Sequence, residues 1–240
     1  MRKLDIHCHI LPGLDDGSKS MKETMKILKM ARRQNIISAI ATPHYSPHYR
    51  NDNPEEIKEL CRLTEKQAQE VVDPAFRIYP GQEIFFSDEV LEKLKRGELL
   101  TLAESDYVLI EFMPDVPYSN LQRVVRNLTM ERYMPILAHI ERYDVLREDG
   151  RVEELTELGA YMQMNYRHIG GKWYSDTARW CRKMLKESRI HFLATDSHDM
   201  RTRYPATTDA ELWMQKHLDK EYIRNLFYKN AKKILINQKI

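Results

Sequence analysis

The sequence predicts an α/β fold, a closed or nearly closed barrel of seven β/α units that occupies residues 1–240 as a single domain. Strand and helix patterns alternate along the whole chain, and no linker rich in Pro, Gly or Ser separates them. Alternation of this kind implies parallel strands joined by crossover helices. Seven units without a break in composition favour a barrel, with a doubly wound open sheet as the alternative.

Seven apolar, partly β-branched runs are the predicted strands. They cover residues 3–10, 37–45, 76–84, 106–112, 134–140, 159–166 and 189–198. Stretches between them repeat apolar residues at three and four positions, which is typical of helices. Helices are expected over residues 20–35, 53–72, 120–133 and 174–188, and the tail from residue 209 predicts two or three more.

The composition argues against nucleic-acid and membrane partners. Lys plus Arg (38) nearly balances Asp plus Glu (36), and neither sign forms a long block. Asp5, His7 and His9 interrupt any signal-peptide core, and no later apolar run approaches about 18 residues. The three cysteines, Cys8, Cys61 and Cys181, form no C-x-x-C pair. We therefore expect a cytoplasmic protein with reduced thiols and no membrane insertion.

Most predicted strands end in a side chain that can bind a metal ion. Six of the seven do so, through His7 and His9, His44, Glu83, Glu111, His139, and Asp196 with His198. The sixth strand ends instead at Asn165, with His168 shortly after. Barrel enzymes place their sites at this end, where converging buried acids and imidazoles are costly unless a positive charge neutralises them. The pattern therefore predicts divalent metal ions.

The spacing within the first strand supports this prediction. Alternate side chains of a strand share a face, so His7 and His9 can bind one ion while Cys8 points away. Asp196 and His198 have the same spacing. Mixed imidazole and carboxylate ligands suit Mn, Fe or Zn, and their number exceeds the needs of a single ion. Two or three ions are implied.

Other phosphate-handling motifs are absent from the sequence. Gly13 and Gly17 are one position too close for a phosphate-binding loop of the G-x-x-x-x-G-K-[ST] type. No cysteine is followed by Arg six positions later, as a cysteine phosphatase would require, and no G-x-S-x-G elbow occurs.

Six motifs in order, DIHCHILPGLDDG, ATPHY, GQEI, VLIEF, AHIERYD and ATDSH, resemble the PHP (polymerase and histidinol phosphatase) superfamily. More closely, they resemble the metal-dependent bacterial protein-tyrosine phosphatases that regulate capsule and exopolysaccharide synthesis. The likeness runs from Lys3 to about Pro205 and continues in the tail. It implies a distorted TIM-like (β/α)7 barrel, the PHP fold, with C-terminal helices.

The resemblance also implies three divalent ions, usually manganese, with iron or zinc as alternatives. The implied ligands of the first ion are His7, His9, Glu83 and Asp196. Glu83 bridges to a second ion held by Glu111 and His139, and the implied ligands of the third are Asp16, His44 and His198. Arg142 matches an arginine that binds the substrate phosphate. Arg203 is the second such candidate, with Arg201 as its alternative.

The expected reaction is hydrolysis of a phosphate monoester by a metal-bound hydroxide. The resemblance implies phosphotyrosine on the tail of a bacterial tyrosine kinase as substrate. Asp196, His198 or a bound water donates the proton to the leaving group, and the sequence does not choose among them. Histidinol phosphatase or another small-molecule phosphomonoesterase is the alternative function, and a non-catalytic PHP module is a further one.

Several polar residues near these motifs receive other expectations. Asp5 and Asp15 are expected to shape a turn or orient a histidine rather than to bind metal. Surface or packing roles are expected for His48, His168 and His191. Substrate contact is an open possibility for the loop at residues 45–52, which carries Tyr45, Tyr49 and Arg50.

Overall fold

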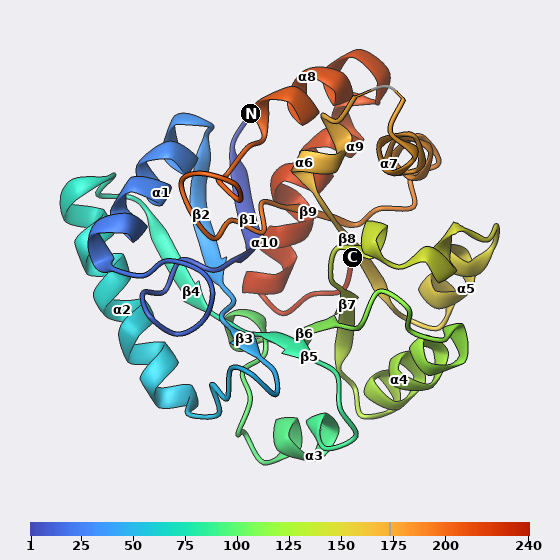
Figure 1. Ribbon diagram of the computed structural model, residues 1–240, viewed down its shortest axis with the longest axis horizontal. Helices are drawn as coiled ribbons and strands as arrows, with labels where there is room; N and C mark the ends of the chain where they lie inside the picture. Colours follow the sequence, from blue (N-terminus) through green and yellow to red (C-terminus); the bar gives the residue numbers. More distant parts are fainter. Residues whose placement is uncertain (173) are drawn as a thin grey trace.

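The computed structural model describes residues 1–172 and 174–240. Its strands are β1 (Lys3–Cys8), β2 (Ile36–Ala41), β3 (His44–Tyr45), β4 (Arg77–Pro80), β5 (Glu83–Phe85), β6 (Tyr107–Glu111), β7 (Met134–Leu137), β8 (Tyr161–Asn165) and β9 (Phe192–Ala194). Its α-helices are α1 (Met21–Arg33), α2 (Pro54–Val71), α3 (Val90–Lys95), α4 (Tyr118–Met130), α5 (Arg151–Glu157), α6 (Tyr166–Ile169), α7 (Asp176–Lys186), α8 (Thr208–His217), α9 (Lys220–Arg224) and α10 (Asn230–Leu235). Figure 1 shows the helices arranged around a central group of strands.

The strands form two curled parallel sheets. One has the order β1-β2-β4, and the other has the order β3-β5-β6-β7-β8-β9. The order follows the sequence without reversal, which argues against the doubly wound alternative. Between β1 and β9, an isolated parallel bridge joins Cys8 to Ser197. The architecture is thus a curled parallel half-barrel. The parallel α/β class expected from the sequence is confirmed, but a full barrel of seven β/α units is not.

Two of the predicted strands are each broken into two segments. The run at 37–45 divides into β2 and β3 on either side of Pro43, which has no backbone N–H to donate to a ladder. The run at 76–84 divides at Gly81, where a Cβ atom would lie 2.9 Å from side chains of Ile40 and Leu102. The chain bends at both breaks, and His44 then pairs with Glu83 in register.

The four helices expected between strands are all present, with ends that differ by a few residues. Ser20 caps α1 by accepting a hydrogen bond from the Glu23 N–H, and Asn53 caps α2 ahead of Pro54. In the tail, α8, α9 and α10 confirm the expected two or three helices. The short helices α3, α5 and α6 were not predicted, because four to seven residues carry too little periodicity to be recognised.

The apolar faces of the helices pack on the outside of the sheets. Helices α1 and α2 pack on β2 and β4, and α4 and α5 pack on β7 and β8 (Figure 1). Cys8 lies in an apolar cluster with Met25 and Ile57 from these helices, so it points away from His7 and His9 as expected. Within the described residues, no helix is both long and apolar enough to cross a membrane.

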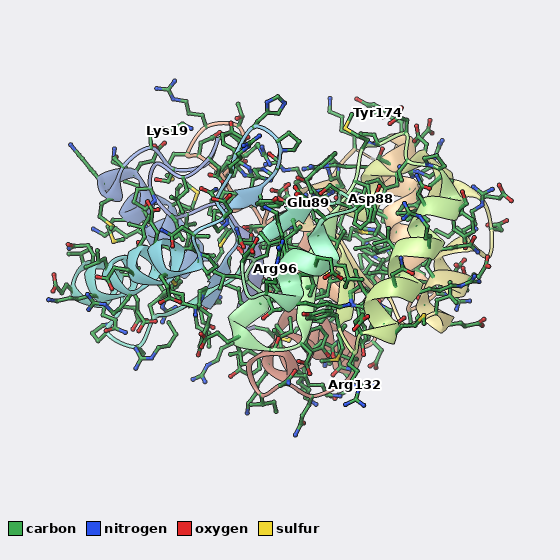
Figure 2. All side chains as sticks on the ribbon, turned by 90° about the horizontal axis from the view of Figure 1, so that it is seen from below. Lys19, Asp88, Glu89, Arg96, Arg132 and Tyr174 are labelled. Carbon is green, nitrogen blue, oxygen red and sulfur yellow. The ribbon has the colours of Figure 1, made fainter. Side chains whose placement is uncertain are left out.

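The parallel strands give the molecule two distinct edges. Figure 2 shows Lys19 and Tyr174, from loops that follow β1 and β8, at one edge, and Arg132, which precedes β7, at the opposite edge. The first edge carries the carboxyl ends of the strands, where sites form in folds of this type.

Candidate metal centre

The structure gathers all nine predicted ligands at the carboxyl edge of the strands. Their ligand atoms form four groups, each with its atoms within 4.8 Å of one another. The groups are His7 with His9 and Asp196; His7 with Glu83 and His139; His44 with Glu83 and Glu111; and His9 with Asp16, His44 and His198. Three groups differ from the implied ligand sets, because His7 joins Glu83 and His139, His44 joins Glu83 and Glu111, and His9 joins the third set.

Glu83 lies at the middle of the cluster, where the break at Gly81 has placed it. Its Oε2 atom is 3.0 Å from His7 Nε2, 3.1 Å from His9 Nε2 and 3.2 Å from His44 Nδ1. None of these contacts has hydrogen-bond geometry, so Glu83 Oε2 is a buried atom without a hydrogen-bond partner. Lone pairs that converge without sharing a proton are the arrangement that a cation satisfies.

Two further groups complete the centre on either side of Glu83. Towards β6, His139 Nε2 lies 2.7 Å from Glu83 Oε1 and 3.6 Å from Glu111 Oε2. Towards the loop after β1, Asp16 Oδ1 lies 3.4 Å from His44 Nε2 and 3.3 Å from His198 Nε2. His198 Nε2 and His44 Nδ1 are likewise buried and without a hydrogen-bond partner. The number of imidazole and carboxylate groups is enough for more than one divalent ion. That these groups bind metal stays a prediction.

Groups behind the cluster fix which nitrogen of each histidine faces it. His7 Nδ1 lies 3.1 Å from Gln163 Oε1, and His9 Nδ1 lies 2.8 Å from Asp15 Oδ2. These oxygens accept but cannot donate, so the proton sits on Nδ1 and the Nε2 lone pair faces the centre. His198 has the same arrangement, with Nδ1 3.0 Å from the backbone oxygen of Asp196. Asp15 therefore orients a histidine, as expected.

The loop that holds Asp15 depends on a close approach of the backbone. Asp15 Oδ1 accepts the Gly17 N–H at 2.8 Å, and Oδ2 accepts the His44 N–H at 2.9 Å. A Cβ atom at Gly17 would lie 2.2 Å from the backbone oxygen of His9, so only glycine fits there. The D-D-G sequence thus brings Asp16 over the cluster.

Gln163 and Asn165 are functional neighbours that the sequence reasoning did not assign. Gln163 Oε1 also accepts the His139 N–H at 2.7 Å, and Asn165 Nδ2 donates to Asp196 Oδ2 at 2.9 Å. The available signal was polar residues at alternate positions inside an otherwise apolar strand, Q-M-N, because such residues share the inward face of β8.

Two ligand candidates adopt strained backbone conformations. His139 has φ 34° and Asp196 has φ 50°, both in the left-handed region that non-glycine residues rarely adopt. Each follows the end of a strand, and the conformation turns its side chain back over the strand ends. Strain of this kind is concentrated at functional sites.

Protons and positive ions compete for this centre. Burial opposes the charged form of His139, but hydrogen bonds to Glu111 and Glu83 outweigh it and raise its pKa to about 9. Burial would raise the pKa of Glu83, yet the neighbouring His7 and His44 hold it well below its ordinary value. Metal binding must displace the proton that this raised pKa leaves on His139, so the affinity rises with pH.

Two arginines reach the centre through the same carboxylate. Arg142 Nη2 lies 2.5 Å from Asp196 Oδ2, and Arg203 Nη2 lies 2.9 Å from Asp196 Oδ1. Arg203 also pairs with Asp16 at 3.2 Å. Arg201 is exposed instead, and its backbone N–H donates to Asp199. The geometry therefore favours Arg203 over Arg201 as the second phosphate-binding candidate.

The remaining polar residues lie outside the ligand groups. Asp5 accepts hydrogen bonds from the N–H and hydroxyl of Thr195, so it joins β1 to β9 rather than orienting a histidine. His191 Nδ1 accepts the Met162 N–H, as expected of a packing residue. His168 lies 3.7 Å from the buried Glu141 and His48 is exposed.

A cavity of about 470 Å³ adjoins the metal centre. Its lining includes His44, Glu111, His139 and Arg142 together with Tyr49. Ser46, Pro47 and His48 of the 45–52 loop line this cavity too, whereas Tyr45 and Arg50 line another cavity of about 270 Å³.

Comparisons with known proteins agree over nearly the full chain. A family model described as "Capsular polysaccharide synthesis, CpsB/CapC" matches residues 3–236. Tyrosine-protein phosphatase CpsB of Streptococcus pneumoniae is 33% identical over 99% of this chain and 100% of its own. Tyrosine-protein phosphatase YwqE of Bacillus subtilis is 31% identical over 99% of this chain and 93% of its own.

Solved structures give the same result. A structure from a study of YwqE and CpsB, described there as metal-dependent tyrosine phosphatases, superposes with a TM-score of 0.90 at 30% identity and covers 99% of this chain and 96% of its own. The phosphotriesterase homology protein of Escherichia coli superposes with a TM-score of 0.62 at 12% identity, covering 98% of both chains, and shares the fold alone.

Proposed function

Because this chain belongs to the CpsB/CapC family of capsular polysaccharide synthesis, we propose that it acts as its named relatives do: it is a metal-dependent protein-tyrosine phosphatase. It hydrolyses the phosphate ester of phosphotyrosine in a protein substrate. The observation that carries this proposal is the convergence of nine acids and imidazoles around buried atoms that have no hydrogen-bond partner.

The nine side chains hold three divalent ions. Mn²⁺ is the expected metal, with Fe or Zn as alternatives. Such ions, when bound, lower the pKa of a coordinated water and offset the charge of a phosphate. The ligand residues are His7, His9, Asp16, His44, Glu83, Glu111, His139, Asp196 and His198. Gln163 and Asp15 accept hydrogen bonds from the Nδ1 atoms of His7 and His9, which leaves the Nε2 atoms of these histidines facing the centre.

The two arginines bind the phosphate oxygens. Arg142 is the stronger candidate, because it lines the cavity beside the centre as well as contacting Asp196. A guanidinium presents paired N–H donors that match the geometry of a phosphate. Asp196 and His198 remain alternative donors of the proton that the leaving oxygen takes up. A tyrosine oxygen, with a pKa near 10, needs less help from such a donor than an alkyl alcohol.

The partner is the tyrosine-phosphorylated tail of a bacterial tyrosine kinase that controls capsule or exopolysaccharide synthesis. The family description and the named relatives support a role in capsule synthesis. We assign the protein to the cytoplasm, which suits its three buried free cysteines. Residues 1–240 act as a single phosphatase domain, and the two curled sheets together correspond to a distorted (β/α)7 barrel.

The test is a direct assay of the purified protein. Bound metals are counted, and hydrolysis of a phosphotyrosine peptide is compared with hydrolysis of histidinol phosphate, with and without Mn²⁺. We expect Mn²⁺-dependent turnover that favours the peptide and is lost in a His139→Ala variant. Faster turnover of histidinol phosphate would instead support the small-molecule phosphatase alternative. Absence of both activities from the metal-loaded protein would support the non-catalytic alternative.

A further inference from the structure

The cavity beside the metal centre has two kinds of lining. One kind is the set of titratable or charged side chains of His44, Glu111, His139 and Arg142, which belong to the centre or contact it. The other kind is mostly apolar and aromatic, is called the walls below, and consists of Pro47, Tyr49, Phe85, Phe112, Met113 and Pro114, with Ser46 and His48 beside them. We propose that these walls form a slot for the phenyl ring of phosphotyrosine, in which Tyr49 and Met113 select aryl over alkyl phosphates. This inference rests on the proposed function and names the residues that decide its specificity.

Tyr49 forms one wall and is in contact with the centre itself. Its ring is stacked on the ring of His44, with centroids 5.9 Å apart and planes inclined by 15°. The stack holds the tyrosine at the rim of the cavity, half-buried, with its ring beside the metal-ligand candidate. A substrate ring that approaches the centre must therefore pass an aromatic surface, which favours another aromatic ring.

A second part of the walls follows directly from β6. Phe112 comes after Glu111 and is 7% exposed, with its ring edge-on to Tyr143 at 6.1 Å. The Phe112 N–H donates to the Tyr143 hydroxyl at 3.1 Å, which fixes this wall. Met113, the next residue, is 57% exposed although it is apolar. An exposed apolar side chain at the rim of a polar pocket is typical of a binding surface.

The depth of the centre supports a tyrosine rather than a serine ester. Glu83 and His139 are each 1% exposed, and His139 also lines the cavity, so a phosphate that reaches them through this cavity passes its walls. In phosphotyrosine the ring fills this passage and leaves the peptide main chain outside. A phosphoserine has no ring, so its main chain would have to enter an apolar passage and lose hydrogen bonds to water. The flexible side chain of Met113 can adapt to the face of the substrate ring in this passage.

The experiment compares two substrates on variants of the metal-loaded enzyme. Tyr49→Ala and Met113→Ala are assayed with a phosphotyrosine peptide and a phosphoserine peptide of the same sequence. We expect kcat/KM for the phosphotyrosine peptide to fall about three- to ten-fold, chiefly through KM, while the phosphoserine value changes much less. Inhibition by inorganic phosphate, which has no ring, should keep its wild-type constant. Tyr49→Phe and Met113→Leu should restore the preference.

The matched control is Met130→Ala, which removes an equally flexible methionine that is 81% exposed near Arg132 at the opposite edge of the molecule (Figure 2). It should leave both substrates unaffected. The slot proposal would be wrong if Tyr49→Ala and Met113→Ala lowered kcat/KM equally for both peptides and weakened inhibition by phosphate to the same extent. These side chains would then support the centre itself. An unchanged substrate preference would overturn it too. Failure of the proposed function looks different, since the wild-type enzyme would then not hydrolyse the phosphotyrosine peptide at all.

Discussion

Strand β1 carries buried polar side chains at both of its ends, and the two ends differ in how these groups are paired. At the amino end, Lys3 Nζ donates to Gln34 O at 2.8 Å and to Glu211 Oε2 at 2.5 Å. Asp5 accepts two hydrogen bonds from Thr195. Each charge at this end has a protein partner of complementary chemistry.

At the carboxyl end the pairing is different. His7 Nε2 and His9 Nε2 lie 3.2 Å apart, and both approach Glu83 Oε2 without a hydrogen bond to it. Buried polar groups in proteins are nearly always satisfied, so an unsatisfied cluster implies a ligand. The comparison separates a structural polar network from a functional one within the seven residues from Lys3 to His9.

The largest expected effect follows from Glu83→Gln, which removes the central charge of the unsatisfied cluster. We expect kcat/KM for a phosphotyrosine peptide to fall about 1,000-fold. The rise in melting temperature that Mn²⁺ produces in the wild type should shrink, because that rise depends on metal affinity. Glu59→Gln, on the exposed face of α2, should change neither quantity. A wild-type response to Mn²⁺ in Glu83→Gln would contradict the assignment.

The second effect concerns Arg142, which contacts the centre from the cavity side. Arg142→Ala should lower kcat/KM about 100-fold while leaving the number of bound ions unchanged, because a phosphate-binding donor is lost and no ligand is. Arg142→Lys should recover part of the activity, since it keeps the charge but not the paired donors. Arg201→Ala, at a nearby exposed arginine, is the control and should keep full activity. Full activity in Arg142→Ala would exclude phosphate binding by Arg142.

The third effect sharpens the contrast between two buried aspartates. Asp15→Asn should weaken binding of the ion beside His9 by about 10- to 100-fold, because the hydrogen bond that orients this imidazole is lost. Asp5→Asn should leave metal affinity unchanged and lower the free energy of unfolding by about 1–2 kcal/mol, through its Thr195 bonds. Metal titration and urea unfolding measure the two quantities. Equal metal affinities in Asp15→Asn and Asp5→Asn would show that Asp15 does not support metal binding more than Asp5 does.

The smallest effect lies at the paired amino end and depends on pH. Burial raises the pKa of Glu211, but hydrogen bonds from Lys3 and the N-terminal ammonium outweigh this and lower it below its ordinary 4.5. Its contribution to stability is therefore complete above pH 4.5 and is lost as the pH falls through the lower folded pKa. Glu211→Gln should cost about 1–2 kcal/mol at pH 7 and progressively less in acid. A cost that is independent of pH would rule out this pairing as its source.

The sequence alone determined the alternation of strands and helices, the face that His7 and His9 share, and eight of the nine converging side chains, whereas Asp16 was implied only by the family resemblance. These inferences succeed because periodicity and strand-end position are local properties that any parallel α/β fold preserves. The exposure of Arg201 and the support from Gln163 were not visible in the same way, since both depend on residues distant in sequence.

The tertiary structure decided where two of the predicted strands are interrupted. The predicted strands divide at Pro43, which lacks a backbone donor, and at Gly81, where Ile40 and Leu102 leave no room for a Cβ atom. These breaks set Glu83 beside His44 and place it at the middle of the cluster. The sequence shows which residues can bind metal, but only packing between distant segments fixes which atoms meet and which are left without a partner.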